Sequence, residues 1–434
     1  MSNEGSRPMQ DDALLERRYR LLGRASPLFY ERPLHLVRGE GVWVYDADGR
    51  RYLDAYNNVP HVGHCHPHVV EALCRQAGTL NTHTRYLHEA ILEYGERLTA
   101  TFDGALTMAH FCCSGTEASE LALRIAKACT GNEGVIVTDF CYHGNSATIA
   151  ALSTAFPVPE GVGANVRTIT VPDPYRPRDG IDPADAAERY AEDVANAIAS
   201  LAEQGMRPAA LFVDTIFATE GMPKIPPGYL EKAVALVRAA GGLYIADEVQ
   251  PGFGRTGDRM WGHQHFGAVP DLVTLGKPMG NGHPLGGVVG RADLFHAFGK
   301  RAMYFNTFGG NPVSCAVGLA VLEVIERENL IAHARKVGDH VQAGLHRLAQ
   351  KHAIIGDVRG RGLFFGAELV KDRATKTPAT DETKTAINAM RERGVLMSRT
   401  GRYDNILKIR PPMPFAAEHA DLLLATLDDV LGAL

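Results

Sequence analysis

Short apolar runs alternate with longer amphipathic segments between residues 108 and 290. Six of these runs have the length of strands, and several are almost wholly apolar, which is typical of strands covered on both faces of a sheet. They are MAHFC (108–112), VIVT (135–138), AALFV (209–213), LYIA (243–246), DLVTL (271–275) and LGGVV (285–289). The alternation predicts an α/β fold with a mostly parallel sheet.

The clearest helix signal lies between the second and third of these runs. Asp182 and Pro183 have the residue types of an N-cap and a first helical position, and Gly205 supplies a stop signal. Between them apolar residues recur at helical spacing, at Ala187, Tyr190, Ala191, Val194, Ile198 and Leu201. We therefore predict a helix over residues 182–205.

The pattern changes beyond residue 312. It predicts a long helix at 313–328, a glycine-punctuated strand region at 356–370, a helix near 381–393 and an amphipathic C-terminal helix. Near the N-terminus, GVWVYDADGRRYLD predicts two strands around an Asp-Gly turn. We predict a large domain at 71–312 and a smaller α+β domain at 313–434, with residues 1–70 packing beside the smaller one.

Composition narrows the class of partner. The chain has 434 residues, 45% of them hydrophobic, and a formal net charge of −5. It carries no basic block, so we expect neither nucleic acid nor a membrane surface as a partner, and no run reaches the roughly 18 apolar residues of a membrane span. The seven cysteines contain no C-x-x-C pair, and the N-terminal residues lack the apolar segment of a signal peptide. We expect a soluble cytoplasmic protein that acts on small molecules.

Polar residues follow the predicted strands, where ligands gather in a parallel sheet. After MAHFC, the residues Ser114, Gly115 and Thr116 open a helix, and the free N–H groups of such a turn can hold a phosphate. A plain helix cap is the alternative interpretation. After VIVT come Tyr142 and His143, and an aromatic ring there can stack on a planar ligand or simply join the core.

A carboxylate, Asp247, stands directly behind LYIA. So deep a carboxylate needs a cationic partner, either an arginine or a protonated heterocycle.

Two other motifs are rejected. Gly252, Gly254 and Gly257 match the spacing of a dinucleotide fingerprint, but acidic residues precede them and no helix-opening sequence follows. The loop HVGHCHPH lacks regular ligand spacing and a second cluster that would complete a zinc site, so we predict no metal.

A lone lysine, Lys277, follows DLVTL directly after Gly276. Lysine normally keeps its ammonium in water, so its place at the mouth of an apolar strand needs a reason. A phosphate-binding turn, a stacking aromatic, a buried carboxylate and an isolated lysine are what pyridoxal 5'-phosphate requires. Lys277 forms the Schiff base with its aldehyde, and Asp247 keeps its ring nitrogen protonated.

Nearly the whole chain resembles the class III aminotransferase family of fold-type I pyridoxal-phosphate enzymes. The likeness begins at HLVRGEGVWVYDADGRRYLD and extends to the last helix. It implies that Gly115 and Thr116 bind the cofactor phosphate, that Tyr142 stacks on the ring and that Gln250 reaches the ring hydroxyl. It also implies that Thr307 reaches the cofactor phosphate of a partner subunit, in a homodimer with shared active sites; whether dimers pair into tetramers stays open.

Within the family, the chain is most similar to the ethanolamine-phosphate and phosphohydroxylysine phospho-lyases. The motifs are NNVPHVGHCHP, TRYLHE, GKPMGNGHP, NTFGGNPVSCAVGLAVLEVIE and NILKIRPPM. DTIFATEGMP, with Asp214, replaces the Glu-Pro-x-Gln-Gly of transaminases. This resemblance implies elimination of phosphate from a small phosphorylated amine such as O-phosphoethanolamine, and a second anion site, for which Arg85 and Lys408 are candidates.

Three alternatives stay open at this point. Phosphohydroxylysine is an alternative substrate, and an ω-aminotransferase acting on amines or ω-amino acids is the alternative enzyme. The alternative outside enzymes is a pyridoxal-phosphate-binding regulator, but the sequence shows neither a DNA-binding module nor the basic surface that such a role needs.

Overall fold

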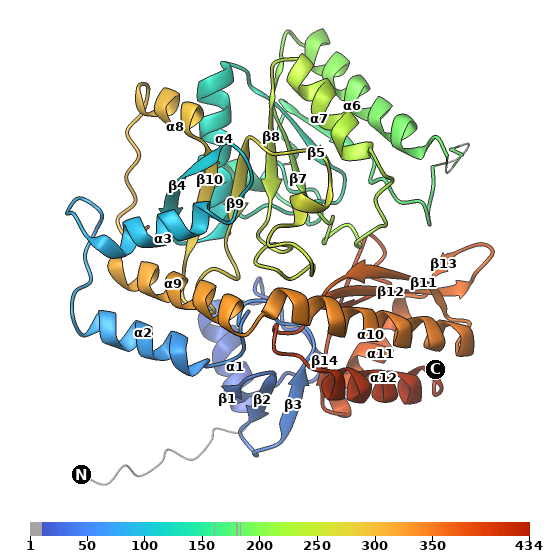
Figure 1. The fold of residues 1–434 in the computed structure, drawn as a ribbon. Coiled ribbons are helices and arrows are strands. Elements are labelled where there is room, and N and C mark those ends of the chain that lie inside the picture. The colour runs from blue at the N-terminus through green and yellow to red at the C-terminus, as the bar shows by residue number, and fades with distance from the viewer. Residues whose placement is uncertain (1–10, 160, 179–180, 183) are drawn as a thin grey trace.

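A seven-stranded sheet forms the centre of the larger part of the molecule (Figure 1). In this computed structural model, the described residues are 11–159, 161–178, 181–182 and 184–434. The strand order is β4-β10-β9-β8-β7-β5-β6, and only β10 runs antiparallel to its neighbours. The strands are β4 (Leu106–Cys112), β5 (Gly134–Thr138), β6 (Val166–Ile169), β7 (Pro208–Asp214), β8 (Leu243–Asp247), β9 (Leu272–Leu275) and β10 (Gly286–Arg291).

The six predicted strands coincide with β4, β5, β7, β8, β9 and β10 to within two residues at each end. The missed strand, β6, lies at the sheet edge, where Thr168 is exposed and Arg167 half-buried, so it lacks an unbroken apolar run. The central strands are apolar throughout because helices cover both faces of the sheet. Phe212 of β7 packs in the cluster of α4 (Gly115–Thr130), whereas Leu211 packs with α6 (Ala186–Glu203) and α7 (Tyr229–Ala239).

The start of α6 corrects the sequence prediction. The helix begins at Ala186, with Asp185 as its N-cap, rather than at residue 182. Asp182 instead closes a turn, because its carboxylate accepts a hydrogen bond from the N–H of Ala184 at 2.8 Å and its carbonyl accepts one from Asp185 at 3.0 Å. Pro183 lies outside the described residues.

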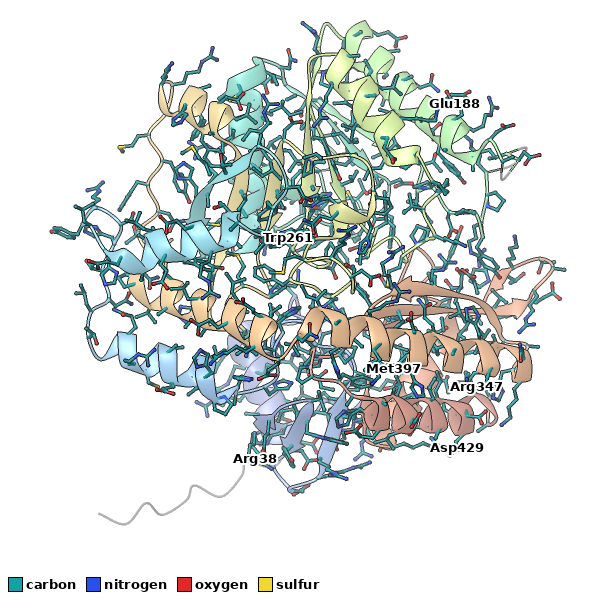
Figure 2. The ribbon with its side chains drawn as sticks, viewed as in Figure 1. Arg38, Glu188, Trp261, Arg347, Met397 and Asp429 are labelled. Carbon is teal, nitrogen blue, oxygen red and sulfur yellow. The ribbon has the colours of Figure 1, made fainter. Side chains whose placement is uncertain are left out.

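Residues 11–299 supply further helices. They are α1 (Asp11–Leu22), α2 (Pro67–Ala77), α3 (Glu89–Thr99), α5 (Ala147–Ala150), the 3₁₀ turn η1 (Gly262–His265) and α8 (Ala292–Gly299). In Figure 1, α1 lies beside the N-terminal strands and α2 beside α9 (Pro312–Arg327). Trp261, labelled in Figure 2, is fully buried and stacks on Phe102 with ring centroids 4.2 Å apart. Its indole N–H donates to Thr101 Oγ1 at 3.0 Å, which fixes the loop after β8 against the end of α3.

The second half of the chain supplies two consecutive long helices, α9 (Pro312–Arg327) and α10 (Leu330–Lys351), that run below the large sheet in Figure 1. The sequence analysis had predicted only the first. Beyond them lies a sheet ordered β11-β12-β16-β15. Its members and neighbours are β11 (Ile355–Arg361), β12 (Phe364–Asp372), β13 (Thr377–Pro378), α11 (Thr380–Glu392), β15 (Ser398–Thr400), β16 (Ile406–Ile409) and α12 (Ala417–Leu431).

The N-terminal strands lie beside this second half. They are β1 (Leu36–Glu40), β2 (Trp43–Asp46) and β3 (Arg51–Asp54), and β3 pairs in parallel with β14 (Val395–Leu396). One hydrophobic cluster runs from the large sheet through α9 and α10 to α12. The domain boundaries therefore stay a prediction, since the two halves share a core.

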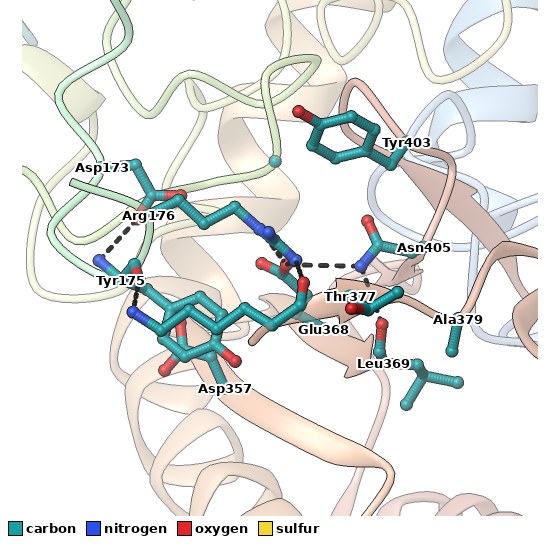
Figure 3. Close-up of polar contacts among 12 residues, drawn as sticks. Asp173, Tyr175, Arg176, Asp357, Glu368, Leu369, Thr377, Ala379, Tyr403 and Asn405 are labelled. Carbon is teal, nitrogen blue, oxygen red and sulfur yellow. Dashed lines mark hydrogen bonds and ion pairs between the residues drawn. The ribbon is translucent and has the colours of Figure 1, made fainter. Parts of the chain in front are cut away.

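A buried polar network joins the loop after β6 to the smaller sheet (Figure 3). Glu368 of β12 is fully buried, and its carboxylate accepts hydrogen bonds from Arg359 and Arg176 at 2.5 Å each and from Asn405 at 3.3 Å. Arg359 also pairs with Asp173 in that loop at 3.0 Å. The network fixes β12, the strand that pairs with β16.

Candidate active site

The carboxyl ends of β4, β5, β7, β8 and β9 meet at one edge of the large sheet, and the predicted site residues follow them. Asp247 is the last residue of β8 and is 4% exposed. Its Oδ2 lies 2.7 Å from Nδ1 of His143, and its Oδ1 accepts the N–H of Val249 at 3.0 Å. Burial opposes the charged form of His143, yet Cys141 and Asp247 together hold its pKa well above the ordinary range. The histidine therefore fixes this carboxylate and favours a positive charge beside it.

Lys277 follows β9 and is partly buried in the same region. Burial, and then the positive charge of Arg410, lower its pKa to about 8, against the opposing effect of Asp247 and Asp214. An amine with this pKa is partly unprotonated near neutral pH, so it can act as a nucleophile or accept a proton.

The turn before α4 lies against Lys277. A Cβ added at Gly276 would stand 3.1 Å from the Cα of Gly115, so the two glycines let these backbones meet. Ser114 caps α4 by accepting the N–H of Glu117 at 3.2 Å, and the Thr116 hydroxyl bonds to Asn145 at 3.1 Å. The helix N-terminus is thus in position to hold an anion beside Lys277.

Tyr142 stands beside this turn and is half-buried. Its ring meets Phe156 edge-on at 5.4 Å. His143, the next residue, stacks on Phe212 at 4.2 Å and is buried behind Asp247. The two neighbours thus differ in role: His143 supports the carboxylate, and Tyr142 alone offers a partly open ring.

Two buried cations lie on the other side of the site. Lys408 of β16 and Arg410 just beyond it are each 6% exposed, and both donate to Oε1 of Gln250. Lys408 Nζ is 3.3 Å from that oxygen, and Nε of Arg410 donates to the carbonyl of Tyr56 at 3.0 Å. Among the residues that the structure describes, neither cation has a carboxylate within ion-pair distance. Arg410 was missed in the sequence, although it stands directly before Pro411 and Pro412.

Two buried carboxyl groups, Asp214 and Glu220, lie close enough to Lys408 for their charges to act on it. Burial, and then the charge of Asp247, raise the pKa of Asp214 well above its ordinary value. Burial also raises the pKa of Glu220 to about 7. One oxygen of Glu220 accepts the Thr138 hydroxyl, and the other has no hydrogen-bond partner among the described residues.

Arg85 and Thr307 lie elsewhere, on an exposed surface. The Arg85 guanidinium stands 4.1 Å above the ring of Phe305, two residues before Thr307. Within the described residues, no hydrogen bond or ion pair joins Arg85 to Lys408, and Arg85 as an anion ligand stays a prediction. The histidines of residues 61–68 do not gather on a metal either: His64 pairs with Asp54 at 2.7 Å and His61 with the carbonyl of Phe253 at 2.7 Å. Across the described ranges, no cluster of metal-ligating residues is present and no helix is long and apolar enough to cross a membrane.

Comparison with known proteins places this arrangement in a family. The model of the family "Aminotransferase class-III" matches residues 29–431. A phospholyase from Arthrobacter, solved in complex with phosphoethanolamine, is 51% identical with a TM-score of 0.94, covering 97% of this chain and all of that one. "Alanine–glyoxylate aminotransferase 2 homolog 2, mitochondrial" of Arabidopsis thaliana is 42% identical over 96% of this chain and 87% of its own length. "Ethanolamine-phosphate phospho-lyase homolog 1" of Caenorhabditis elegans is 36% identical over 97% and 93%.

The chain belongs to the class III aminotransferase family, which confirms the resemblance seen in the sequence. It is a fold-type I enzyme whose cofactor is pyridoxal 5'-phosphate. The residues present fit this group: Asp247 offers a buried carboxylate for a protonated ring nitrogen, the α4 N-terminus can hold its phosphate, and Lys277 carries an amine with a lowered pKa. The close approach of Gly115 and Gly276 brings the backbone just before Lys277 against the phosphate-binding turn.

Proposed function

We propose that the protein is a phospho-lyase that eliminates phosphate from O-phosphoethanolamine to give acetaldehyde, ammonia and phosphate. The observation that carries the proposal is the pair of buried cations, Lys408 and Arg410, without a carboxylate partner in the described part of the chain. Arg410 opposes the charged form of Lys408, and holding both groups charged and buried costs free energy unless an anion joins them. A phosphate dianion compensates both, whereas a single carboxylate compensates one.

The similarity to the Arthrobacter phospholyase supports the same substrate class, since that protein was solved with phosphoethanolamine. The relatives named aminotransferases keep an ω-aminotransferase as the alternative activity. The two activities differ in what they need: elimination requires no second substrate, and transamination requires a keto-acid acceptor.

In the proposed reaction each residue has a defined task. The cofactor, when bound, withdraws electrons from the carbon that carries the substrate nitrogen. Lys277 accepts the proton from that carbon, which its lowered pKa permits near neutral pH. Asp247, held by His143, provides the negative charge opposite the ring nitrogen. Arg410 and Lys408 bind the substrate phosphate, with Gln250 keeping both cations in place.

We also propose a homodimer as the working form. Apolar side chains crowd the surface around Arg85 and Thr307: Leu87 and Met303 are 101% and 80% exposed, and Phe308 is 69% exposed. These residues lie in two segments, 85–87 and 303–308, which meet where Arg85 covers Phe305, and exposed large apolar residues on neighbouring segments are typical of an interface. A second copy covering this face would bring Thr307 towards its partner's site. Sedimentation analysis of the holoenzyme should give twice the chain mass, and a monomer at micromolar concentration would contradict the dimer.

The activity is tested by incubating the holoenzyme with a panel of phosphorylated amines without any keto acid, while free phosphate is measured. Phosphoethanolamine should release phosphate continuously. Phosphohydroxylysine, the alternative substrate, is assayed separately in the same panel. Replacing Arg410 with Ala should raise KM for phosphoethanolamine at least about 10-fold, because one charged hydrogen-bond donor to the phosphate is lost. If no member of the panel releases phosphate, the proposed function is wrong.

A further inference from the structure

The proposed elimination needs a proton at the oxygen that leaves. When the C–O bond of a phosphate monoester dianion breaks, its electron pair stays on that oxygen, and an unprotonated product would be a strongly basic trianion. A donor within hydrogen-bond reach removes this barrier and is worth about 10²–10⁴-fold in rate. Arg410 cannot supply the proton, because the guanidinium group of arginine does not give up a proton in proteins. Lys277 already carries the task of accepting the proton from carbon, and a separate donor at the phosphate end lets both proton transfers proceed together.

Lys408 has the geometry of such a donor. It lies in the middle of β16, paired with Gly366 on one side and Ser398 on the other, so its backbone is fixed. Its Nζ donates to the carbonyl of Ala218 at 3.3 Å and to Gln250 Oε1 at 3.3 Å. An ammonium has three N–H groups. The third has no acceptor among the described residues, and the neighbouring Arg410 marks where a phosphate would sit.

The charges around Lys408 tune it for proton release. Burial, and then the cations Arg410 and Lys277, hold its pKa well below the ordinary lysine range, while Asp214 and Glu220 act in the opposite direction. A lowered pKa makes an ammonium a better acid near neutral pH. A bound phosphate dianion favours the charged form, so Lys408 is protonated when the substrate is in place.

Resting on the proposed function, we propose that Lys408 is the general acid of the elimination, giving its proton to the oxygen between phosphorus and carbon. The C–H bond breaks with its proton passing to Lys277, a C=C bond forms, and the C–O bond breaks with its electron pair on oxygen. That oxygen takes the proton from Nζ, so hydrogen phosphate departs. The enamine product adds one water and yields acetaldehyde and ammonia.

The test compares two leaving groups on the variant Lys408→Arg. Phosphoethanolamine needs a proton on its leaving oxygen, whereas 2-fluoroethylamine releases fluoride, a weak base that leaves unprotonated. For Lys408→Arg we expect a nearly unchanged KM for phosphoethanolamine but a kcat lower by about 10²–10⁴-fold. Fluoride release by the same variant should fall at least about 10-fold less than phosphate release does, and the remaining fluoride release also reports that the variant is folded and holds its cofactor. Lys300→Arg, on the surface, is the matched control.

The pH profile gives a second readout. The wild-type kcat for phosphoethanolamine should fall at high pH as Lys408 loses its proton in the substrate complex, and this limb should be absent in Lys408→Arg. A kcat for Lys408→Arg close to wild type would reduce Lys408 to an anion ligand and overturn the proposal, as would equal losses on both substrates. These outcomes presuppose phosphate release by the wild type; if the wild type releases none, it is the proposed function that fails.

Discussion

Nδ1 of His143 lies 2.7 Å from Oδ2 of Asp247, and both side chains are buried behind the end of β8. The contact gives this buried carboxylate a histidine partner whose pKa is raised, so a positive charge is favoured beside it. The pair joins β8 to the segment after β5, which lie two strands apart. The contact therefore depends on the tertiary fold, and no local sequence pattern predicts it.

Replacing Asp247 with Asn should remove the charge that faces the ring nitrogen while preserving the size of the side chain. We expect kcat to fall by about 10²–10³-fold, the usual effect of losing one preorganised electrostatic group. Phosphate release and the cofactor absorption band should be measured on the same sample. Asp339→Asn, on the exposed face of α10, is the control and should keep its activity. An active Asp247→Asn enzyme would exclude this role.

The pKa of Lys277 predicts how the stability of the cofactor-free protein depends on pH. Its value of about 8, against an ordinary 10.5, means that between these pH values the unfolded chain binds more protons at this lysine than the folded chain. The free energy of unfolding should therefore rise over this range, by on the order of 3 kcal/mol. Denaturation of the wild type and of Lys277→Met in parallel isolates the contribution of this lysine. The free energy of unfolding of the wild type minus that of Lys277→Met should rise between pH 8 and 10.5. Parallel curves would contradict the lowered pKa.

Gly276 sets the distance between the Lys277 backbone and the phosphate-binding turn. A Cβ there would stand 3.1 Å from the Gly115 Cα, and backbone atoms cannot yield as a flexible side chain can. Gly276→Ala should cost about 1–3 kcal/mol of local packing and weaken pyridoxal 5'-phosphate binding about 10-fold or more. Titrating the cofactor into the cofactor-free protein measures this. Gly299→Ala, where a Cβ meets nothing within 4 Å, should bind pyridoxal 5'-phosphate as the wild type does. Equal cofactor affinities of the two variants would show that the close contact between Gly276 and Gly115 is unimportant.

The network around Glu368 is expected to stabilise the smaller sheet. Glu368→Gln removes the negative charge that faces the buried guanidinium of Arg359. Breaking a buried ion pair typically lowers the free energy of unfolding by about 3–5 kcal/mol. Chemical denaturation at matched protein concentration measures the loss. The control is Glu192→Gln, which removes an exposed pair with Arg189 and should cost less than about 1 kcal/mol. Similar losses in both variants would contradict a special role for Glu368.

Much of the large sheet could be predicted from the sequence because its strands are unbroken apolar runs. The edge strand β6 could not, since Thr168 faces solvent and breaks the pattern. The roles of Lys277 and Asp247 could be inferred because strand ends meet at one edge in a parallel sheet. Arg410 was harder to recognise, since its significance depends on contacts with Tyr56 and Gln250, which lie 354 and 160 residues away in the chain.

The most direct test of the account is the number of phosphate molecules released per active site when holoenzyme meets phosphoethanolamine with no keto acid. We predict many turnovers, acetaldehyde and phosphate in equal amounts, and a cofactor that keeps its aldehyde-form absorption throughout. Release that stops within one turnover, or a cofactor converted to its amine form, would contradict elimination and identify the enzyme as a transaminase.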